Sequence, residues 1–174
     1  MSDVQTASRS KILALEAAMK EQEQVEIVAV EHFCGGVYAR EITIPKGVAL
    51  VGEIHLKDQI NVVSKGTIRV FTEDGEKTIT APCTFISPAG VKRAGYAVTE
   101  TVWTVFHATE LTNEDDIRKE FIAPDYITLD KQLRKQHELG GNGSNSNNDH
   151  RYCGTATESI KESRKACESR RNRS

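Results

Sequence analysis

The middle of the chain alternates between short apolar runs and turn residues. Residues 37–44 read as an alternating strand that ends at the turn Pro45-Lys46-Gly47. The expected strands are residues 25–30, 37–44, 48–51, 60–63, 67–72, 77–79, 84–86 and 99–108, with Asp74-Gly75 as a hairpin turn. Roughly eight short strands in about a hundred residues predict an all-β fold, either a small barrel or a jelly roll.

Helical patterns flank these strands. In residues 1–24, Ser10 is a candidate N-cap, and Ile12, Leu15 and Met19 share one face at helical spacing. Such a helix either covers a barrel end or a sheet edge, or binds a partner.

A second, shorter helix is expected after the last strand. Thr112 or Asn113 can cap its N-terminus, and Pro124 is expected to stop it. Its apolar positions, which can pack back on the barrel, are Ile117, Phe121 and Ile122.

Composition divides the chain into three segments. We expect a helical extension over residues 1–24, the barrel over residues 25–130, and a flexible, polar and partly basic tail over residues 131–174. The basic end of this tail is either a solvated segment or an arm for nucleic acid or an acidic partner. No aromatic residue interleaves with its charges from residue 158 onward, which disfavours base stacking.

Charge and cysteine usage narrow the class of protein. The chain has 174 residues and a formal net charge of -2, which gives no global case for binding nucleic acid or a membrane. It has no apolar run of about 18 residues, and its first residues lack a secretory pattern. The four cysteines are widely spread and form no CxxC pair, so we expect reduced thiols in the cytoplasm and no zinc knuckle.

Residues 47–66 carry the first of two informative spacings. Counted back from Gly66, this stretch places Glu53, His55 and Gln59 where the first motif of the cupin superfamily has two histidines and a glutamate. One of the three residues therefore agrees with that motif.

Residues 82–97 carry the second spacing. Pro88 and Gly90 match the second cupin motif, and Arg93 stands where the motif has a histidine. The chain thus resembles the cupin superfamily at the scaffold positions and at one of four metal-ligand positions. This resemblance implies a small cupin-type β-barrel with a degenerate metal site.

The chemistry of these residues leaves two alternatives. Because strand side chains alternate between faces, we expect Glu53 and His55 inside the barrel and Ile54 outside it. Divalent iron, manganese or zinc could use His55, Glu53 and Gln59 as ligands. Arg93 argues against a metal because a guanidinium stays protonated and repels a cation. It would instead bind a carboxylate or phosphate, or pair with Glu53.

His107 leaves a second question open. It shares a strand face with Trp103 and Val105. If that face lines the barrel, His107 can join His55 as a metal ligand; otherwise it is a histidine bonded in the sheet or exposed on its surface.

A polar cluster of Lys92, Arg93 and Tyr96 follows Gly90. It either lines the barrel mouth and contacts an anionic ligand, or forms an exposed turn with a charged edge strand. The candidate ligand-binding residues are therefore Glu53, His55, Gln59, Arg93 and Tyr96. The candidate metal ligands are His55, Glu53, Gln59 and His107.

Over residues 30–125, the chain also resembles a group of short, single-domain cupin-like proteins of tailed phages and prophages. Matching stretches include His32-Phe33, Leu50-Val51-Gly52, Ser64-Lys65-Gly66 and Ser87-Pro88-Ala89-Gly90. This resemblance implies a phage protein in the host cytoplasm, and it implies no particular activity.

Two functions remain as hypotheses. The first is a non-enzymatic binding or assembly module, without a cofactor, that takes a small anionic molecule or a protein partner and forms a homodimer, as small cupins often do. The alternative is a metal-dependent oxygenase or isomerase that uses His55 with Glu53, Gln59 or His107. A metal-free sugar epimerase is a weaker variant, because no histidine-aspartate base or tyrosine acid can be assigned.

Overall fold

A computed structural model describes residues 3–139, with side-chain surroundings for residues 7–135. Eleven strands and three helices make up this part of the chain. In chain order they are α1 (Asp3–Lys20), β1 (Ala29–Cys34), β2 (Val37–Ile44), β3 (Ala49–Val51), β4 (Ile54–His55), β5 (Gln59–Lys65), β6 (Thr67–Thr72), β7 (Gly75–Thr80), β8 (Cys83–Ser87), β9 (Ala94–Ala97), β10 (Thr101–Ala108), α2 (Glu114–Phe121), β11 (Ile122–Ala123) and α3 (Tyr126–Leu139). Within these residues, no helix is both long enough and apolar enough to cross a bilayer.

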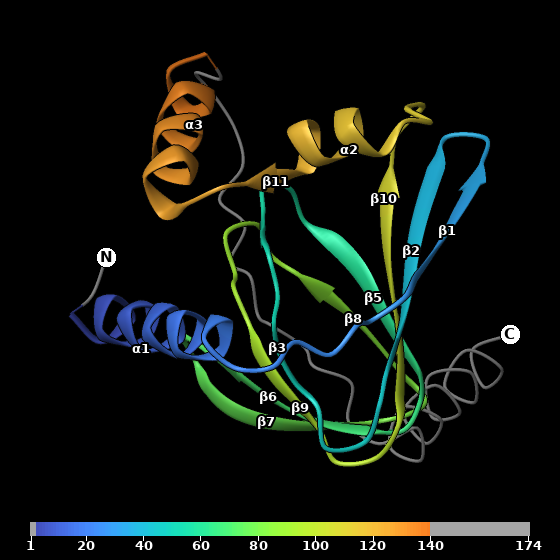
Figure 1. Ribbon diagram of the computed structural model, residues 1–174. Helices are drawn as coiled ribbons and strands as arrows, with labels where there is room; N and C mark the ends of the chain where they lie inside the picture. The colour runs from blue at the N-terminus through green and yellow to red at the C-terminus, as the bar shows by residue number, and fades with distance from the viewer. Residues whose placement is uncertain (1–2, 140–174) are drawn as a thin grey trace, which may run out of the picture.

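The strands form two main antiparallel sheets that face each other (Figure 1). One has the order β1-β2-β10-β5-β8, the other the order β3-β9-β6-β7, and a two-residue pairing of β11 with β4 lies at one end. Because chain neighbours such as β2 and β3 lie in different sheets, the connections cross between the layers, as in a jelly roll. The predicted all-β barrel with an N-terminal helix and a short following helix is therefore confirmed.

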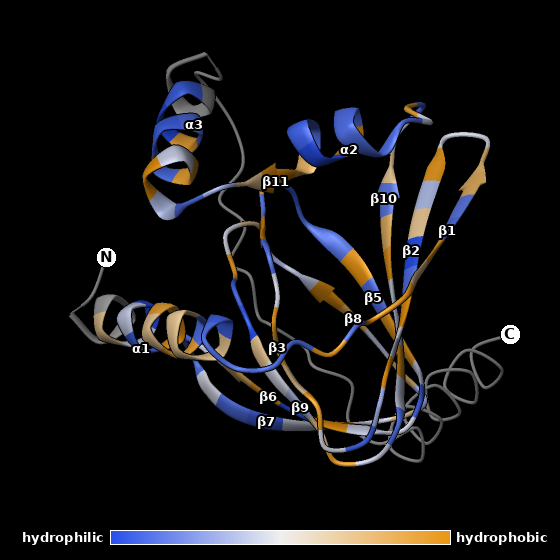
Figure 2. Ribbon diagram, viewed as in Figure 1, coloured by the Kyte–Doolittle hydropathy of each residue, from blue (hydrophilic) through white to orange (hydrophobic). Residues whose placement is uncertain are grey.

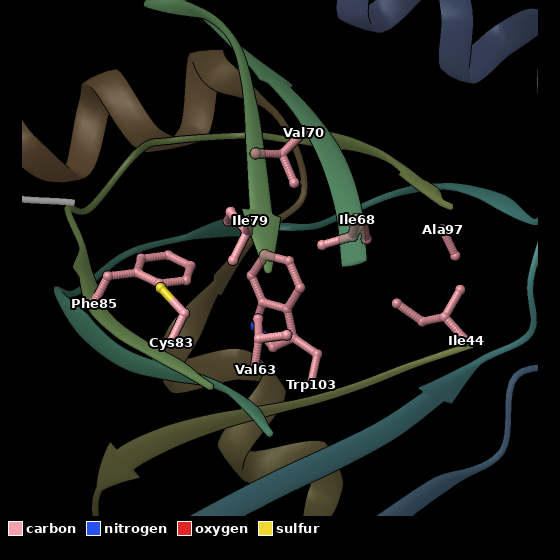
Figure 3. Close-up of a cluster of buried hydrophobic side chains, with 9 residues drawn as sticks. All are labelled: Ile44, Val63, Ile68, Val70, Ile79, Cys83, Phe85, Ala97 and Trp103. Carbon is pink, nitrogen blue, oxygen red and sulfur yellow. The ribbon is translucent and has the colours of Figure 1, made fainter. Parts of the chain in front are cut away.

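The core lies where the inner faces of the two sheets meet. Figure 3 shows side chains from both sheets converging around Trp103, a residue that is 8% exposed. The Trp103 and Phe85 rings pack edge to face with their centroids 5.6 Å apart. The buried cluster comprises Ile44, Val63, Ile68, Val70, Ile79, Cys83, Phe85, Ala97 and Trp103. It fills one end of the barrel, and its members Ile44, Ile68, Val70 and Trp103 also form the closed end of the candidate cavity.

The N-terminal part of the chain corrects two predictions. Ser10 lies inside α1 and is not its N-cap, because the helix already runs at Asp3. On the expected apolar face Ile12 is fully buried, whereas Leu15 is 44% exposed. Polar contacts hold α1 to the barrel instead: Arg9 pairs with Glu73 at 2.6 Å, and Glu16 pairs with the buried Lys92 at 3.1 Å.

The first strand also begins later than expected. Residues 25–28 are irregular, and β1 starts at Ala29 and continues to Cys34, so the Gly35-Gly36 pair turns the chain into β2. The strand needs β2 beside it, and its register pairs Ala29 with Ile42 and Cys34 with Val37. The apolar run at residues 25–28 has no such neighbour, so its composition alone does not make it a strand.

The segment after β10 follows the prediction at its start and departs from it at its end. Asn113 caps α2, accepting a hydrogen bond from the Asp116 N–H at 3.3 Å, and Ile117 and Phe121 are buried against Tyr38. The helix ends at Phe121, before Pro124, because Ile122 and Ala123 pair with β4.

Helix α3 crosses the expected boundary between barrel and tail at residues 130 and 131. It runs to Leu139, and Leu129 is buried with Ile54 and Ala123. Residues 131–139 are thus helical where a flexible tail was expected. The remainder of the predicted tail, including its basic end, lies outside the described residues.

Candidate ligand cavity

A cavity of about 320 Å³ opens between the two sheets beneath α2. Its walls come from β2, β10 and β5 on one side, from β3, β6 and β9 on the other, and from α2 at the mouth. Figure 1 shows α2 lying across this end of the barrel. Figure 2 shows that α2 is largely hydrophilic, which suits a solvent-facing cover. A space of this size suits a small molecule.

The strand register arranges the larger sheet's cavity residues in levels. Opposite residues on paired strands point to the same face, and each level lies two residues further along the strand. From mouth to floor the levels are Tyr38 with His107, Arg40 with Val105 and Asn61, Ile42 with Trp103, and Ile44. We call the second level the arginine level and the last two the apolar levels. Polar chemistry is therefore confined to the half of the cavity nearer α2.

Two histidines meet below α2. His55 comes from β4 and His107 from β10, and their rings are stacked with centroids 5.2 Å apart. Phe121 of α2 covers His107, with ring centroids 4.3 Å apart. The strand face shared by Trp103, Val105 and His107 is thus the cavity face, which answers the question that the sequence left open.

Burial keeps both histidines neutral. Burial, together with the nearby His107, Arg93 and Arg40, lowers the pKa of His55 to about 3. Burial likewise lowers the pKa of His107 to about 4, assisted by the positive charge of Lys57 and opposed by Glu120. At neutral pH each ring therefore offers one N–H donor and one nitrogen acceptor.

Three buried polar atoms in this half of the cavity have no hydrogen-bond partner within the described part of the chain. They are His55 Nδ1, Gln59 Oε1 and His107 Nδ1. Gln59 is 4% exposed and lines the cavity beside Asn61, whose side-chain oxygen accepts a hydrogen bond from the Trp103 indole at 2.9 Å. Because an unpartnered buried polar atom costs about 1–3 kcal/mol, this group is a natural place for a ligand.

Glu53 lies at the mouth of the cavity. Its exposed carboxylate forms a bidentate ion pair with Arg118 of α2. Ile54, the next residue, is 2% exposed and packs against Ala123 and Leu129 on the other side of the strand, as the alternation of strand faces predicted. Glu53 therefore closes the mouth together with α2 and stands apart from the two histidines.

Arg93 and Arg40 bring positive charge to the cavity wall. Arg93 reaches it from the loop before β9, with its guanidinium carbon 5.7 Å from the centre of the Phe85 ring. Arg40 reaches it from β2 and was not singled out from the sequence. Glu31, which lies opposite Arg40 in register, accepts a hydrogen bond from the Tyr38 hydroxyl at 2.8 Å.

Tyr96 is the candidate that the structure places elsewhere. It is 41% exposed on the outer face of β9, and the guanidinium of Arg69 lies 5.3 Å from its ring centre. Its neighbour Gly95 faces the cavity instead. The one-residue alternation of a strand explains the difference, because residues 95 and 96 must point to opposite faces.

The cavity also contains residues that sequence reasoning did not assign to it. The principal ones are Tyr38, Arg40, Asn61, Arg118 and Phe121. Tyr38 and Arg40 were the two with a signal in the sequence, because they share one face of an alternating strand with Ile42. The others reach the cavity through pairings between segments far apart in the chain.

The residues present fit a cupin-type metal ion poorly. His55 and His107 are together, but Glu53 is engaged by Arg118, and Arg93 contributes a positive charge. Among the described residues, no group of three His, Cys, Asp or Glu side chains is placed to hold a metal ion. A third ligand would have to be the neutral Gln59 amide, which is a weak ligand for iron or zinc.

No family model matches the chain, and no curated protein matches it in sequence. Solved structures that resemble it include a cupin superfamily protein from Desulfitobacterium hafniense, with 11% identity over 54% of this chain and 87% of that one and a TM-score of 0.43.

Two further structures are similar to the same degree. KdgF from Halomonas sp. is 19% identical over 55% of this chain and 90% of its own, with a TM-score of 0.43. A cupin domain from Bordetella pertussis is 19% identical over 51% of this chain and 98% of its own, with a TM-score of 0.41. The pairing of the strands in two facing sheets defines the fold. The chain is an antiparallel β-barrel whose similar solved structures include cupin superfamily proteins.

Proposed function

We propose that this barrel is a non-enzymatic module that binds a small anionic molecule in a cupin-like cavity with a degenerate metal site. The observation that carries the proposal is the presence of Arg40 and Arg93 on the wall of a cavity whose two histidines are neutral. Guanidinium groups bind carboxylates and phosphates through paired, charge-assisted hydrogen bonds.

The charge balance of the lining supports an anion. Three arginines, Arg40, Arg93 and Arg118, and two glutamates, Glu53 and Glu114, line the cavity, which leaves a formal excess of one positive charge. Arg118 forms its ion pair with Glu53 at the mouth. Arg40 and Arg93 therefore provide the positive charge that attracts an anion. The attraction is stronger inside the cavity than in bulk water because the effective dielectric constant is lower there.

The test of this proposal replaces the two cavity arginines. We expect Arg40→Gln and Arg93→Gln to weaken the binding of a small carboxylate or phosphate about tenfold or more each, since a hydrogen bond to a charged group contributes about 1.5–3 kcal/mol. The probes are acetate and inorganic phosphate, measured by isothermal titration calorimetry. Native mass spectrometry of gently purified protein searches for a retained molecule.

Arg69→Gln is the matched control, because Arg69 is an exposed arginine on the outer face of the same barrel. Equal losses in all three variants would indicate an effect of net charge alone and would contradict the proposal. The absence of a retained anion, together with no binding of either probe, would also overturn it.

The meeting of His55 and His107 favours a second candidate, a metal-dependent enzyme acting on a small molecule. Bound iron, manganese or zinc would supply Lewis-acid or redox chemistry there. Elemental analysis of protein purified without chelators distinguishes the two proposals. The binding module predicts no stoichiometric metal, whereas stoichiometric metal that is lost in His55→Ala and kept in His32→Ala would favour the enzyme.

The setting and the assembly belong to the same proposal. We infer that the protein is phage-encoded and cytoplasmic and that it forms a homodimer. A protein partner is the alternative to a small anionic ligand. The phage resemblance over residues 30–125 supports the first point, and the need to cover open sheet edges supports the second. Analytical ultracentrifugation of the full chain would show a mass twice that of the monomer if the homodimer is correct.

A further inference from the structure

The lower half of the cavity is chemically different from the upper half. Below the arginine level, the wall of the larger sheet consists of Ile42, Trp103 and Ile44. The opposite sheet adds Leu50, Ile68 and Val70, and all six side chains line the same cavity as Arg40 and Arg93. Ile44, Ile68 and Val70 are at most 2% exposed and close the floor. A purely polar anion would leave the partly buried Ile42 and Leu50 above them without an apolar partner.

We propose that the occupant is an amphiphilic anion, with one carboxylate or phosphate head at the arginine level and an apolar body directed to the floor. This inference rests on the proposed anion-binding function and adds the class of ligand. The head contacts Arg40 and Arg93, and the apolar body lies along the apolar levels.

The geometry sets both the orientation and the length of the ligand. The mouth carries the Glu53–Arg118 pair and Glu114 beside Ile117 and Phe121 of α2, so an apolar body pointing upward would have to pass charged groups. Ile44 is 0% exposed and closes the floor, so the open apolar level is that of Ile42. Arg40 and Ile42 are two residues apart on one strand, which at about 3.3 Å per residue places this level about 7 Å below the arginine level. The ligand therefore needs a body several carbon atoms long.

The inference is tested on the full-length chain with a series of linear carboxylates: acetate, butanoate, hexanoate and octanoate. We expect one ligand per chain and an affinity that rises about three- to fourfold with each added methylene until the floor is reached. Octan-1-ol, which has the same body without a charge, should bind at least about tenfold more weakly than octanoate, because it loses the charge-assisted hydrogen bonds to the arginines.

The outcomes separate this inference from the proposed function. Acetate binding with no gain from chain length would overturn the amphiphile and leave the anion module standing. Failure of every carboxylate and of octyl phosphate to bind would overturn both. Octanol binding as tightly as octanoate would also overturn both. Octyl phosphate binding more tightly than octanoate would support the amphiphile and identify the head as a phosphate.

A variant that fills the floor provides an independent test. Ile42→Phe should reduce octanoate affinity at least about tenfold and leave acetate affinity unchanged, because it occupies the space of the apolar body. Ile60→Phe is the matched control, since Ile60 is 50% exposed and its strand neighbours Gln59 and Asn61 are the residues that face the cavity. If Ile42→Phe does not fold by circular dichroism, Leu50→Phe fills the same floor from the other sheet. Unchanged octanoate affinity in a folded floor variant would overturn the inference.

Discussion

At the scale of single residues, burial determines the chemistry of the two histidines. Their pKa values of about 3 and about 4 both lie below the ordinary value near 6.5. Folded protein therefore holds neutral imidazoles at a pH where the unfolded chain binds protons. Each histidine therefore makes the free energy of unfolding decrease as the pH falls from about 6.5 toward its folded pKa. Above about pH 6.5 the ring is neutral in both states, and the full stability is present.

The His107→Gln variant should show this linkage directly. We expect the wild-type free energy of unfolding to fall between pH 6.5 and pH 4 by up to about 1.4 kcal/mol per pH unit for each histidine, and the variant to fall less steeply. Urea denaturation at several pH values measures both slopes. His32→Gln, at an exposed histidine of β1, should keep the wild-type slope; equal slopes in wild type and His107→Gln would show that His107 is not neutral through burial.

At the scale of elements, the turn between β5 and β6 depends on one glycine. Gly66 has a φ angle of +87°, and a Cβ atom built there would lie 2.0 Å from the Glu100 carbonyl oxygen. That distance is far inside van der Waals contact, so the backbone of the two segments would have to separate. Gly75, in the β6–β7 hairpin, has a φ angle of +108° and open space around it.

These two glycines form a matched pair for a prediction. Gly75→Ala should lower the free energy of unfolding by about 1–2 kcal/mol through the strain of a positive φ alone. Gly66→Ala should lower it by clearly more than about 2 kcal/mol, because a backbone clash adds to the same strain. Thermal and urea unfolding measure the difference, and equal effects would mean that the close approach to Glu100 is not maintained in solution.

At the scale of the whole molecule, α3 joins the segment after the barrel to the strand that carries His55. Leu129 is 1% exposed and packs with Ile54 of β4 and Ala123 of β11, and the two strands pair with each other. The packing of a helix beyond residue 125 thus supports the edge of the cavity.

Leu129→Ala should therefore destabilise the whole barrel by about 2–5 kcal/mol, the usual cost of removing a buried leucine side chain. Ile127→Ala, two residues away on the same helix and 67% exposed, should change the free energy of unfolding by less than about 0.5 kcal/mol. Denaturant titration of both variants provides the measurement. Equal, small effects would indicate that α3 is not part of the cooperative fold.

Local sequence patterns were sufficient to predict those features that depend on residues close together in the chain. The alternation in β2, the cap at Asn113 and the opposite orientation of His55 and Ile54 could all be predicted, because each depends on residues close in sequence. Strands β4 and β11 could not be predicted, since each has two residues and exists only through pairing with the other.

The sequence by itself determined an all-β barrel, the shared face of Trp103, Val105 and His107, and a positive charge at position 93. Only the tertiary structure decided that this face lines the cavity, that Arg40 joins Arg93 there, and that Glu53 pairs with Arg118 from a segment 65 residues away. The physical reason is that strand periodicity defines which side chains lie together, but not which side of the strand the other sheet will cover.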